Sequence, residues 1–91
     1  VGERVETLAS DVRSLAQGNL LNERPAARLI NKLDLAARNI ERGKLRPTCN
    51  NLDAFGAKVD RLIDRSKLLP AYGQPLIASA QSISDQIGCT R

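Results

Sequence analysis

Histidine, tryptophan and methionine are absent from this chain of 91 residues, and Phe55 and Tyr72 are its only aromatic side chains. Histidine is the commonest general base and the commonest metal ligand, so its absence excludes the usual catalytic triads, cysteine–histidine dyads and histidine-based metal sites. The sequence also contains no glycine-rich phosphate loop, zinc-binding motif or calcium-binding loop. We therefore expect a protein that is not an enzyme and that uses neither a cofactor nor a metal.

Long apolar runs are also missing from the sequence. It contains no uninterrupted apolar stretch of the roughly 18 residues that a membrane span needs, and no cleavable leader. The chain begins abruptly within a helical pattern at Val1–Glu3, so we expect it to be a piece of a longer protein. A chain of this length folds as one domain with a modest core, and residues 1–91 are therefore predicted to form a single helical domain.

Valine, threonine and aromatic residues are scarce, which argues against a β-sheet. Apolar residues recur instead at spacings of three and four, the pattern of a helix with one buried face. This pattern predicts helices over residues 3–17, 23–42 and 47–65, and a fourth helix from residue 70 or 72 to residue 87. Their expected buried stripes are Val5, Leu8, Val12 and Leu15; Leu29, Ile30, Leu33, Ala37 and Ile40; Leu52, Phe55, Val59, Leu62 and Ile63; and Leu76, Ile77, Ala80, Ile83 and Ile87.

Two of the predicted helices contain a residue that is unfavourable in a helix interior. If the last helix begins at Pro70, Pro75 lies beyond its first turn and removes a backbone hydrogen bond. That helix is therefore expected either to begin nearer Gly73 or to bend at Pro75. Gly56 lies inside the third helix and costs about 1 kcal/mol there relative to alanine. A close contact between two helices is one explanation for this glycine.

One loop pattern occurs three times between the predicted helices, as Gly18-Asn19-Leu20, Gly43-Lys44-Leu45 and Ser66-Lys67-Leu68. Gly18 is expected to be the left-handed residue that stops the first helix, and Gly43 is expected to end the second. We interpret the three leucines as plugs that cover the ends of the core. Connections this short make consecutive helices antiparallel neighbours. The predicted fold is an all-α, antiparallel four-helix bundle of up-down-up-down topology, and a looser array of three αα-hairpins is the alternative.

The two cysteines are expected to form one disulfide bond. Cys49 lies at the start of the third predicted helix and Cys89 lies just past the end of the fourth, so an antiparallel arrangement brings both to one end of the bundle. Such a bond would stabilise the fold by about 4 kcal/mol in the chain-entropy model. Two unrelated thiols or a two-cysteine metal site are the alternatives, the latter weakened by the lack of histidine. A disulfide indicates an oxidising compartment, so we expect a secreted or cell-surface protein.

The formal net charge is +4, and four arginines of residues 23–42 give this charge a pattern. They fall within about 80° of one another on the face opposite the buried stripe, and a leucine lies among them. We interpret this strip as an anion- or partner-binding surface, and an ordinary solvated face with one exposed leucine is the alternative. The strip consists of Arg24, Arg28, Leu35, Arg38 and Arg42.

Two further surface features each have a simple alternative. Tyr72 is a candidate for stacking on a sugar ring, and a half-buried side chain whose hydroxyl reaches water is the alternative. In the third predicted helix, Asp60 and Asp64 alternate with Arg61 and Arg65. We interpret this alternation as a solvated, charged face rather than as a pair of catalytic carboxylates.

Several short motifs follow one another along the chain: Val5-Glu6-Thr7-Leu8, Gly18-Asn19-Leu20-Leu21-Asn22, Leu29-Ile30-Asn31-Lys32-Leu33, Ile40-Glu41-Arg42-Gly43-Lys44, Leu52-Asp53-Ala54-Phe55 and residues 67–77. In their order and spacing, the chain resembles the FIMAH domain family, a helical module of secreted and surface-attached bacterial proteins. The resemblance implies an accessory domain, often C-terminal and beside a hydrolase domain, and it brings no catalytic residues. The two cysteines and Pro75 depart from the family pattern.

These features predict a non-catalytic accessory or interaction module of a secreted or cell-surface bacterial protein. The alternatives are a carbohydrate- or cell-wall-polymer-binding module and a secreted protein-binding or inhibitor domain with an apolar contact around Leu35 or Leu69. Expected partners are other domains of the parent protein or an extracellular polymer or protein, and the module is expected to be a monomer. Nucleic acid is not expected, because Asp34 and Glu41 flank the strip and stacking aromatics are lacking. An intracellular nucleic-acid-binding bundle would instead have free thiols.

Overall fold

The structure, a computed structural model, describes residues 2–89 and contains four α-helices and no strand within that range. Their bounds are α1 (Gly2–Gln17), α2 (Glu23–Glu41), α3 (Leu45–Asp64) and α4 (Pro70–Gln86). Each predicted boundary lies within two residues of the observed one. α4 begins at Pro70 rather than near Gly73, so Pro75 lies inside the helix. None of these helices is long and apolar enough to cross a membrane.

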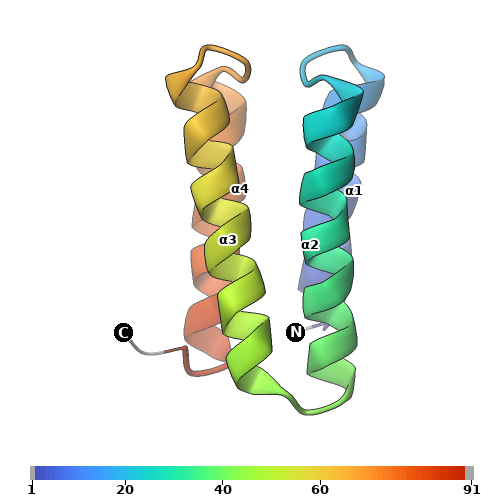
Figure 1. The fold of residues 1–91 in the computed structure, drawn as a ribbon, viewed down its shortest axis with the longest axis vertical. Coiled ribbons are helices and arrows are strands. Elements are labelled where there is room, and N and C mark those ends of the chain that lie inside the picture. Colours follow the sequence, from blue (N-terminus) through green and yellow to red (C-terminus); the bar gives the residue numbers. More distant parts are fainter. Residues whose placement is uncertain (1, 90–91) are drawn as a thin grey trace.

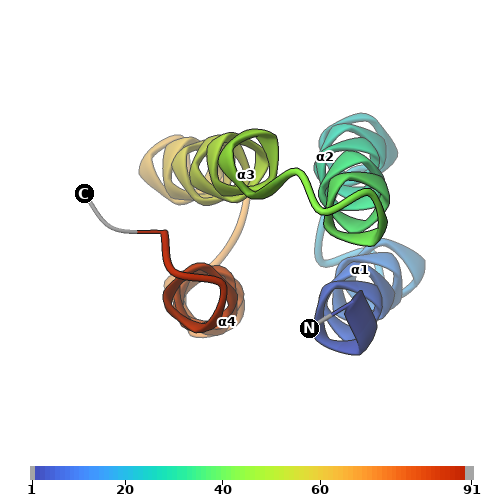
Figure 2. The same ribbon diagram turned by 90° about the horizontal axis from the view of Figure 1, so that it is seen from below.

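The four helices lie side by side. The α1–α2 and α3–α4 connections are at one end of the molecule, and the α2–α3 connection lies at the other end with the first turn of α1 (Figure 1). Seen along their axes, the helices occupy the corners of a quadrilateral in chain order (Figure 2). α2 packs extensively against α1 and α3, and α3 packs extensively against α2 and α4, whereas α1 and α4 contact each other least. α2 and α3 are therefore the two helices with extensive packing on both sides.

The core is aliphatic apart from Phe55, as the composition predicts. Each helix turns one stripe inward, because its apolar residues recur with the helical period. Burying one such side chain contributes about 1.5–3 kcal/mol, so the summed stripes hold the helices together. The core consists of Val5, Leu8, Ala9, Val12, Leu21, Ala26, Leu29, Leu33, Ala36, Leu52, Phe55, Val59, Leu68, Leu76, Ala80 and Ile83, with the remaining members of the predicted stripes partly buried against it.

All four helices end in the same hydrogen-bonded motif. At the end of α1, the N–H of Asn19 donates to the carbonyl of Ala16, and the N–H of Leu20 donates to the carbonyl of Leu15. This pair of bonds is a Schellman cap, whose central residue adopts a left-handed conformation. The prediction that Gly18 is this residue is wrong, because Asn19 has the positive φ of 60°. The corresponding residues at the other three ends are Gly43, Ser66 and Gly88.

This one-residue difference also changes which leucines cover the core. Leu68 is buried as predicted. Leu20 is 42% exposed and Leu45 is 49% exposed, so the prediction that these two leucines cover the ends of the core is wrong. The buried plug after α1 is Leu21, which lies two residues beyond the left-handed Asn19, just as Leu68 lies two residues beyond Ser66. Leu45 occupies the same position after Gly43, but it is already the first residue of α3.

The close contact between helices is at Gly73 and not at Gly56. A β-carbon added to Gly56 would meet no atom within 4 Å, so the explanation predicted for that glycine is wrong. A β-carbon added to Gly73 would lie 2.8 Å from Cγ1 and 2.5 Å from Cδ1 of Ile63 in α3. Gly73 is buried, and its missing side chain therefore allows the first turns of α4 to approach the last turns of α3.

These two glycines provide a matched test, because Gly56→Ala and Gly73→Ala make the same change in two helix interiors. Gly73→Ala is expected to lower the free energy of unfolding by about 1–3 kcal/mol, because Ile63 must move. Gly56→Ala is expected to raise it by up to about 1 kcal/mol, because alanine favours a helix and meets no neighbour. Urea denaturation measures both values, and a Gly73→Ala variant stabilised as much as the Gly56→Ala variant would contradict the assigned contact.

Candidate functional site

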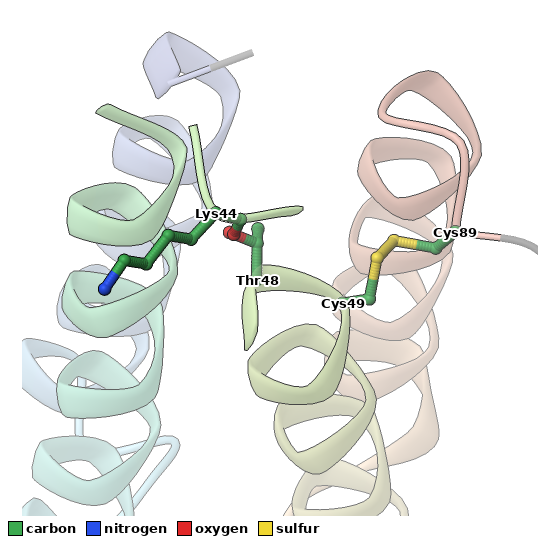
Figure 3. Close-up of a disulfide and its surroundings, with 4 residues drawn as sticks. All are labelled: Lys44, Thr48, Cys49 and Cys89. Atoms are coloured by element: carbon green, nitrogen blue, oxygen red, sulfur yellow. A yellow bond between two sulfur atoms is a disulfide. The ribbon is translucent and has the colours of Figure 1, made fainter. Parts of the chain in front are cut away.

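The disulfide predicted from the sequence is confirmed. Cys49 in α3 is bonded to Cys89, which follows the last helix, and their Cα atoms lie 5.7 Å apart (Figure 3). The backbone N–H of Cys89 also donates to the carbonyl of Ser84, which completes the cap of α4. The covalent bond therefore fixes the segment beyond α4 to the start of α3, and it lies at the end of the molecule that carries the α2–α3 connection.

Thr48, next to the disulfide, is a buried polar residue that the sequence did not indicate. Its side chain is fully buried, and its hydroxyl donates a hydrogen bond of 2.7 Å to the carbonyl of Lys44, at the N-cap of α3 (Figure 3). This bond satisfies the hydroxyl within its own helix, as threonine does with a carbonyl four residues earlier. The disulfide end of the molecule is therefore a structural region, and its buried polar group is already satisfied.

A strongly basic groove of about 660 Å³ lies between α2 and α3. Six of its lining residues are cationic and one, Glu23, is acidic, so the groove has a formal charge of +5, against +4 for the whole chain. The rest of the protein is therefore close to neutral. We call this site the basic groove, and it is lined by Asn22, Glu23, Arg24, Pro25, Arg28, Lys58, Arg61, Leu62, Arg65 and Lys67.

Helical periodicity places the cations of each helix on one face. Arg24 and Arg28 are separated by one turn at the start of α2, and Arg61 and Arg65 are separated by one turn at the end of α3. These two segments lie at the same end of the molecule, where the α1–α2 and α3–α4 connections are (Figure 1). The basic groove is therefore at the end opposite the disulfide.

Lys58 interacts electrostatically with cations of both α2 and α3. Its pKa is lowered from the ordinary value of 10.5, first by burial and then by the positive charges of Lys32, Arg28 and Arg61. Two of those three residues belong to α2, whereas Lys58 belongs to α3. The cations therefore repel one another across the groove, and an anion placed between them would remove that repulsion.

Only part of the strip predicted on α2 lies in the basic groove. All five of its residues are exposed, but only Arg24 and Arg28 line the basic groove, while Leu35, Arg38 and Arg42 lie outside it. Tyr72 is exposed and also lies outside the groove. The role of these residues in binding stays a prediction.

The sequence interpretation missed the cations that α3 contributes to the groove. Arg61 and Arg65 were interpreted with Asp60 and Asp64 as one solvated face, and all four are exposed, but both arginines also line the basic groove, whereas Asp60 lines the second groove, between α3 and α4. The available signal was a pair of arginines four residues apart on each of two consecutive helices.

A second, larger groove of about 1270 Å³ lies between α3 and α4 beside the disulfide. Its lining includes Asp53, Asp60 and Asp85 but only one cation, Arg46, so its charge is opposite to that of the basic groove. Within residues 2–89, no group of three acidic, cysteine or histidine side chains is placed to hold a metal ion. We call this second site the acidic groove, and its formal charge of −2 is smaller in magnitude than the +5 of the basic groove.

No protein-family model, curated protein or solved structure matches this chain significantly. The resemblance to the FIMAH family therefore stays a prediction that depends on the quoted motifs alone. The features of the molecule that bear on function are the geometry and charge of the basic groove and the disulfide.

The contribution of the disulfide can be measured directly. Replacing both cysteines, Cys49→Ser with Cys89→Ser, is expected to lower the free energy of unfolding by about 4 kcal/mol, because a long loop becomes free in the unfolded chain. Urea denaturation measures the loss. Reduced wild-type protein should match the double variant, which should itself not respond to reductant. A loss below about 1 kcal/mol would show that the bond adds little constraint.

The repulsion at Lys58 predicts that this charge destabilises the protein. Lys58→Met keeps most of the apolar stem and is expected to raise the free energy of unfolding by about 0.5 kcal/mol at low salt, with a smaller gain at high salt. Because the folded-state pKa is lowered, wild-type stability should rise as pH increases through the window below 10.5, and the variant should lack that rise. Arg13→Met, which removes an exposed charge of α1 outside the groove, is the control and should give no salt-dependent gain.

Proposed function

We propose that this chain is a non-catalytic accessory and interaction module of a secreted or cell-surface bacterial protein of the hydrolase type. The observation that supports the interaction role is the basic groove, in which α2, α3 and the segment just after α3 gather six cations on a protein that is otherwise close to neutral. Packed helices fix the backbone positions of these residues before a ligand arrives, so only their side chains must become ordered on binding. The module would thus bind a partner rather than transform it.

The proposed scaffold is an antiparallel four-helix bundle of up-down-up-down topology. Support comes from the alternation of the connections between the two ends of the molecule (Figure 1) and from the packing of each helix on its neighbour in the chain. Helices in such a bundle present rigid outer faces, and a site between two of them keeps its geometry. This scaffold suits a binding module whose charges must stay at fixed spacings.

The proposed location outside the cytoplasm depends on the disulfide and on the family resemblance. A disulfide between Cys49 and Cys89 persists in oxidising compartments and is rare in the cytosol. The FIMAH-like motifs agree with a module carried by secreted or surface-attached bacterial proteins, often at their C-terminal end. Under this proposal, the disulfide protects a small domain from local unfolding where chaperones are scarce.

Of the alternative functions, binding of an extracellular polymer is favoured by a specific observation. The basic groove provides a charged surface that a polymer with acidic groups would fit. A protein-binding or inhibitor domain would instead use exposed apolar side chains, and Leu35 and Leu69 are 48% and 61% exposed. Single exposed leucines are common on protein surfaces, so the groove is the stronger indication.

Deletion of this domain from its full-length parent protein tests the accessory role. The deletion is expected to leave turnover of a soluble substrate unchanged and to reduce retention of the parent protein on isolated cell-surface material. Both quantities are measured on the same preparations. Lost turnover with unchanged retention would contradict the proposal, and so would free thiols at Cys49 and Cys89 in protein alkylated directly in its cells.

A further inference from the structure

The basic groove has two features that specify the chemistry of its ligand: the spacing of its charges and the identity of its cations. We propose that this groove binds a linear acidic polysaccharide, with Arg24 and Arg28 of α2 and Arg61 and Arg65 of α3 holding its carboxylate or sulfate groups. This inference depends on the proposed interaction role and adds the binding site and the ligand class.

The spacing of the arginines favours a ligand with repeated charges. Residues four apart on a helix are separated by about 6 Å along its axis, and this separation occurs on both sides of the groove, between Arg24 and Arg28 and between Arg61 and Arg65. From Lys58 to Arg65 the cationic row extends about 10 Å along α3. A single small anion would meet only part of this site, whereas a chain with acidic groups at intervals can meet both rows.

The side chains of the groove match an acidic sugar chain. Arginine presents a planar fork that binds carboxylate, sulfate or phosphate through two parallel hydrogen bonds, and four of the six cations are arginines. The amide of Asn22 can both donate to and accept from hydroxyl groups, which a polysaccharide carries in large number. Pro25 and Leu62 are half-buried and give the groove an apolar part for the faces of sugar rings.

The same lining disfavours two other polyanions. No aromatic side chain is among the residues that line the groove, so it offers no platform on which nucleic-acid bases could stack. The cations also line a concave space between two helices, whereas a lipid bilayer presents its headgroups as a broad surface. A flexible chain narrow enough to lie between α2 and α3 fits this shape better.

Like charges face one another in the free groove, and a ligand of opposite charge would relieve their repulsion. Burial and neighbouring cations lower the pKa of Lys58, and Glu23 is the only acidic residue in the lining. A bound acidic chain would neutralise the repulsion and raise this pKa toward its ordinary value. Functional sites commonly keep such an arrangement of like charges because the ligand supplies the opposite charge.

Two double variants of α2 form a matched test on the full chain. Arg24→Gln with Arg28→Gln removes two charges from the groove, and Arg38→Gln with Arg42→Gln removes two charges at the same spacing on the same helix outside it. All four arginines are exposed, so both variants should keep the wild-type circular dichroism. Affinity for heparin and for polygalacturonate, measured by titration calorimetry, is expected to fall about tenfold or more for the groove variant and less than about threefold for the control.

Poly-L-glutamate, anionic vesicles, duplex DNA and neutral amylose complete the set of probes, and each is expected to bind more weakly than the acidic polysaccharides. The inference is overturned if neither acidic polysaccharide binds, if both double variants lose affinity equally, or if one of the other probes binds more tightly. A failure of this inference can be told apart from a failure of the proposed function. The parent protein could be retained on cell-surface material through this domain, while Arg24→Gln with Arg28→Gln has no effect on that retention. That result would support the interaction role and reject the acidic polysaccharide as its ligand.

Discussion

The packing of α3 against both α2 and α4 is the constraint on which the other features of this protein depend. Leu52, Phe55 and Val59 are almost completely buried and fix the rotation of α3 about its axis. Once that stripe faces the core, the residues on its two flanks must line the spaces beside α2 and α4. The basic groove, the acidic groove and the approach of Cys49 to Cys89 all follow from this one orientation.

The two ends of the molecule differ in their charge and in their energetics. At one end, the disulfide and the buried hydroxyl of Thr48 are satisfied within the protein and stabilise it. At the other end, burial and the like charges that face each other across α2 and α3 lower the pKa of Lys58. A small aliphatic core has little stability to spare, so a covalent link at the first end offsets the repulsion at the second without entering the groove.

Local rules predicted the helices better than the turns between them. Helix boundaries follow from apolar periodicity and from proline, and they were predicted within two residues. The cap of α1 was assigned to Gly18 because glycine tolerates a left-handed conformation, but asparagine tolerates it too, and Asn19 occupies that position. Because the cap was assigned one residue too early, the leucine predicted to cover the core was Leu20, whereas the buried leucine is Leu21. The hydrogen bonds that decide the cap depend on the exact last residue of the helix, which composition does not specify.

The sequence by itself determined the four helices, their buried stripes and the pairing of Cys49 with Cys89, because each depends on short-range periodicity or on the length of a connection. Only the tertiary structure decided that Gly73 rather than Gly56 is the contact between helices. It also decided that Arg61 and Arg65 join Arg24 and Arg28 in one groove. These outcomes depend on how each helix is rotated and how closely it approaches its neighbour. Side-chain packing sets both quantities, and no single helix specifies them.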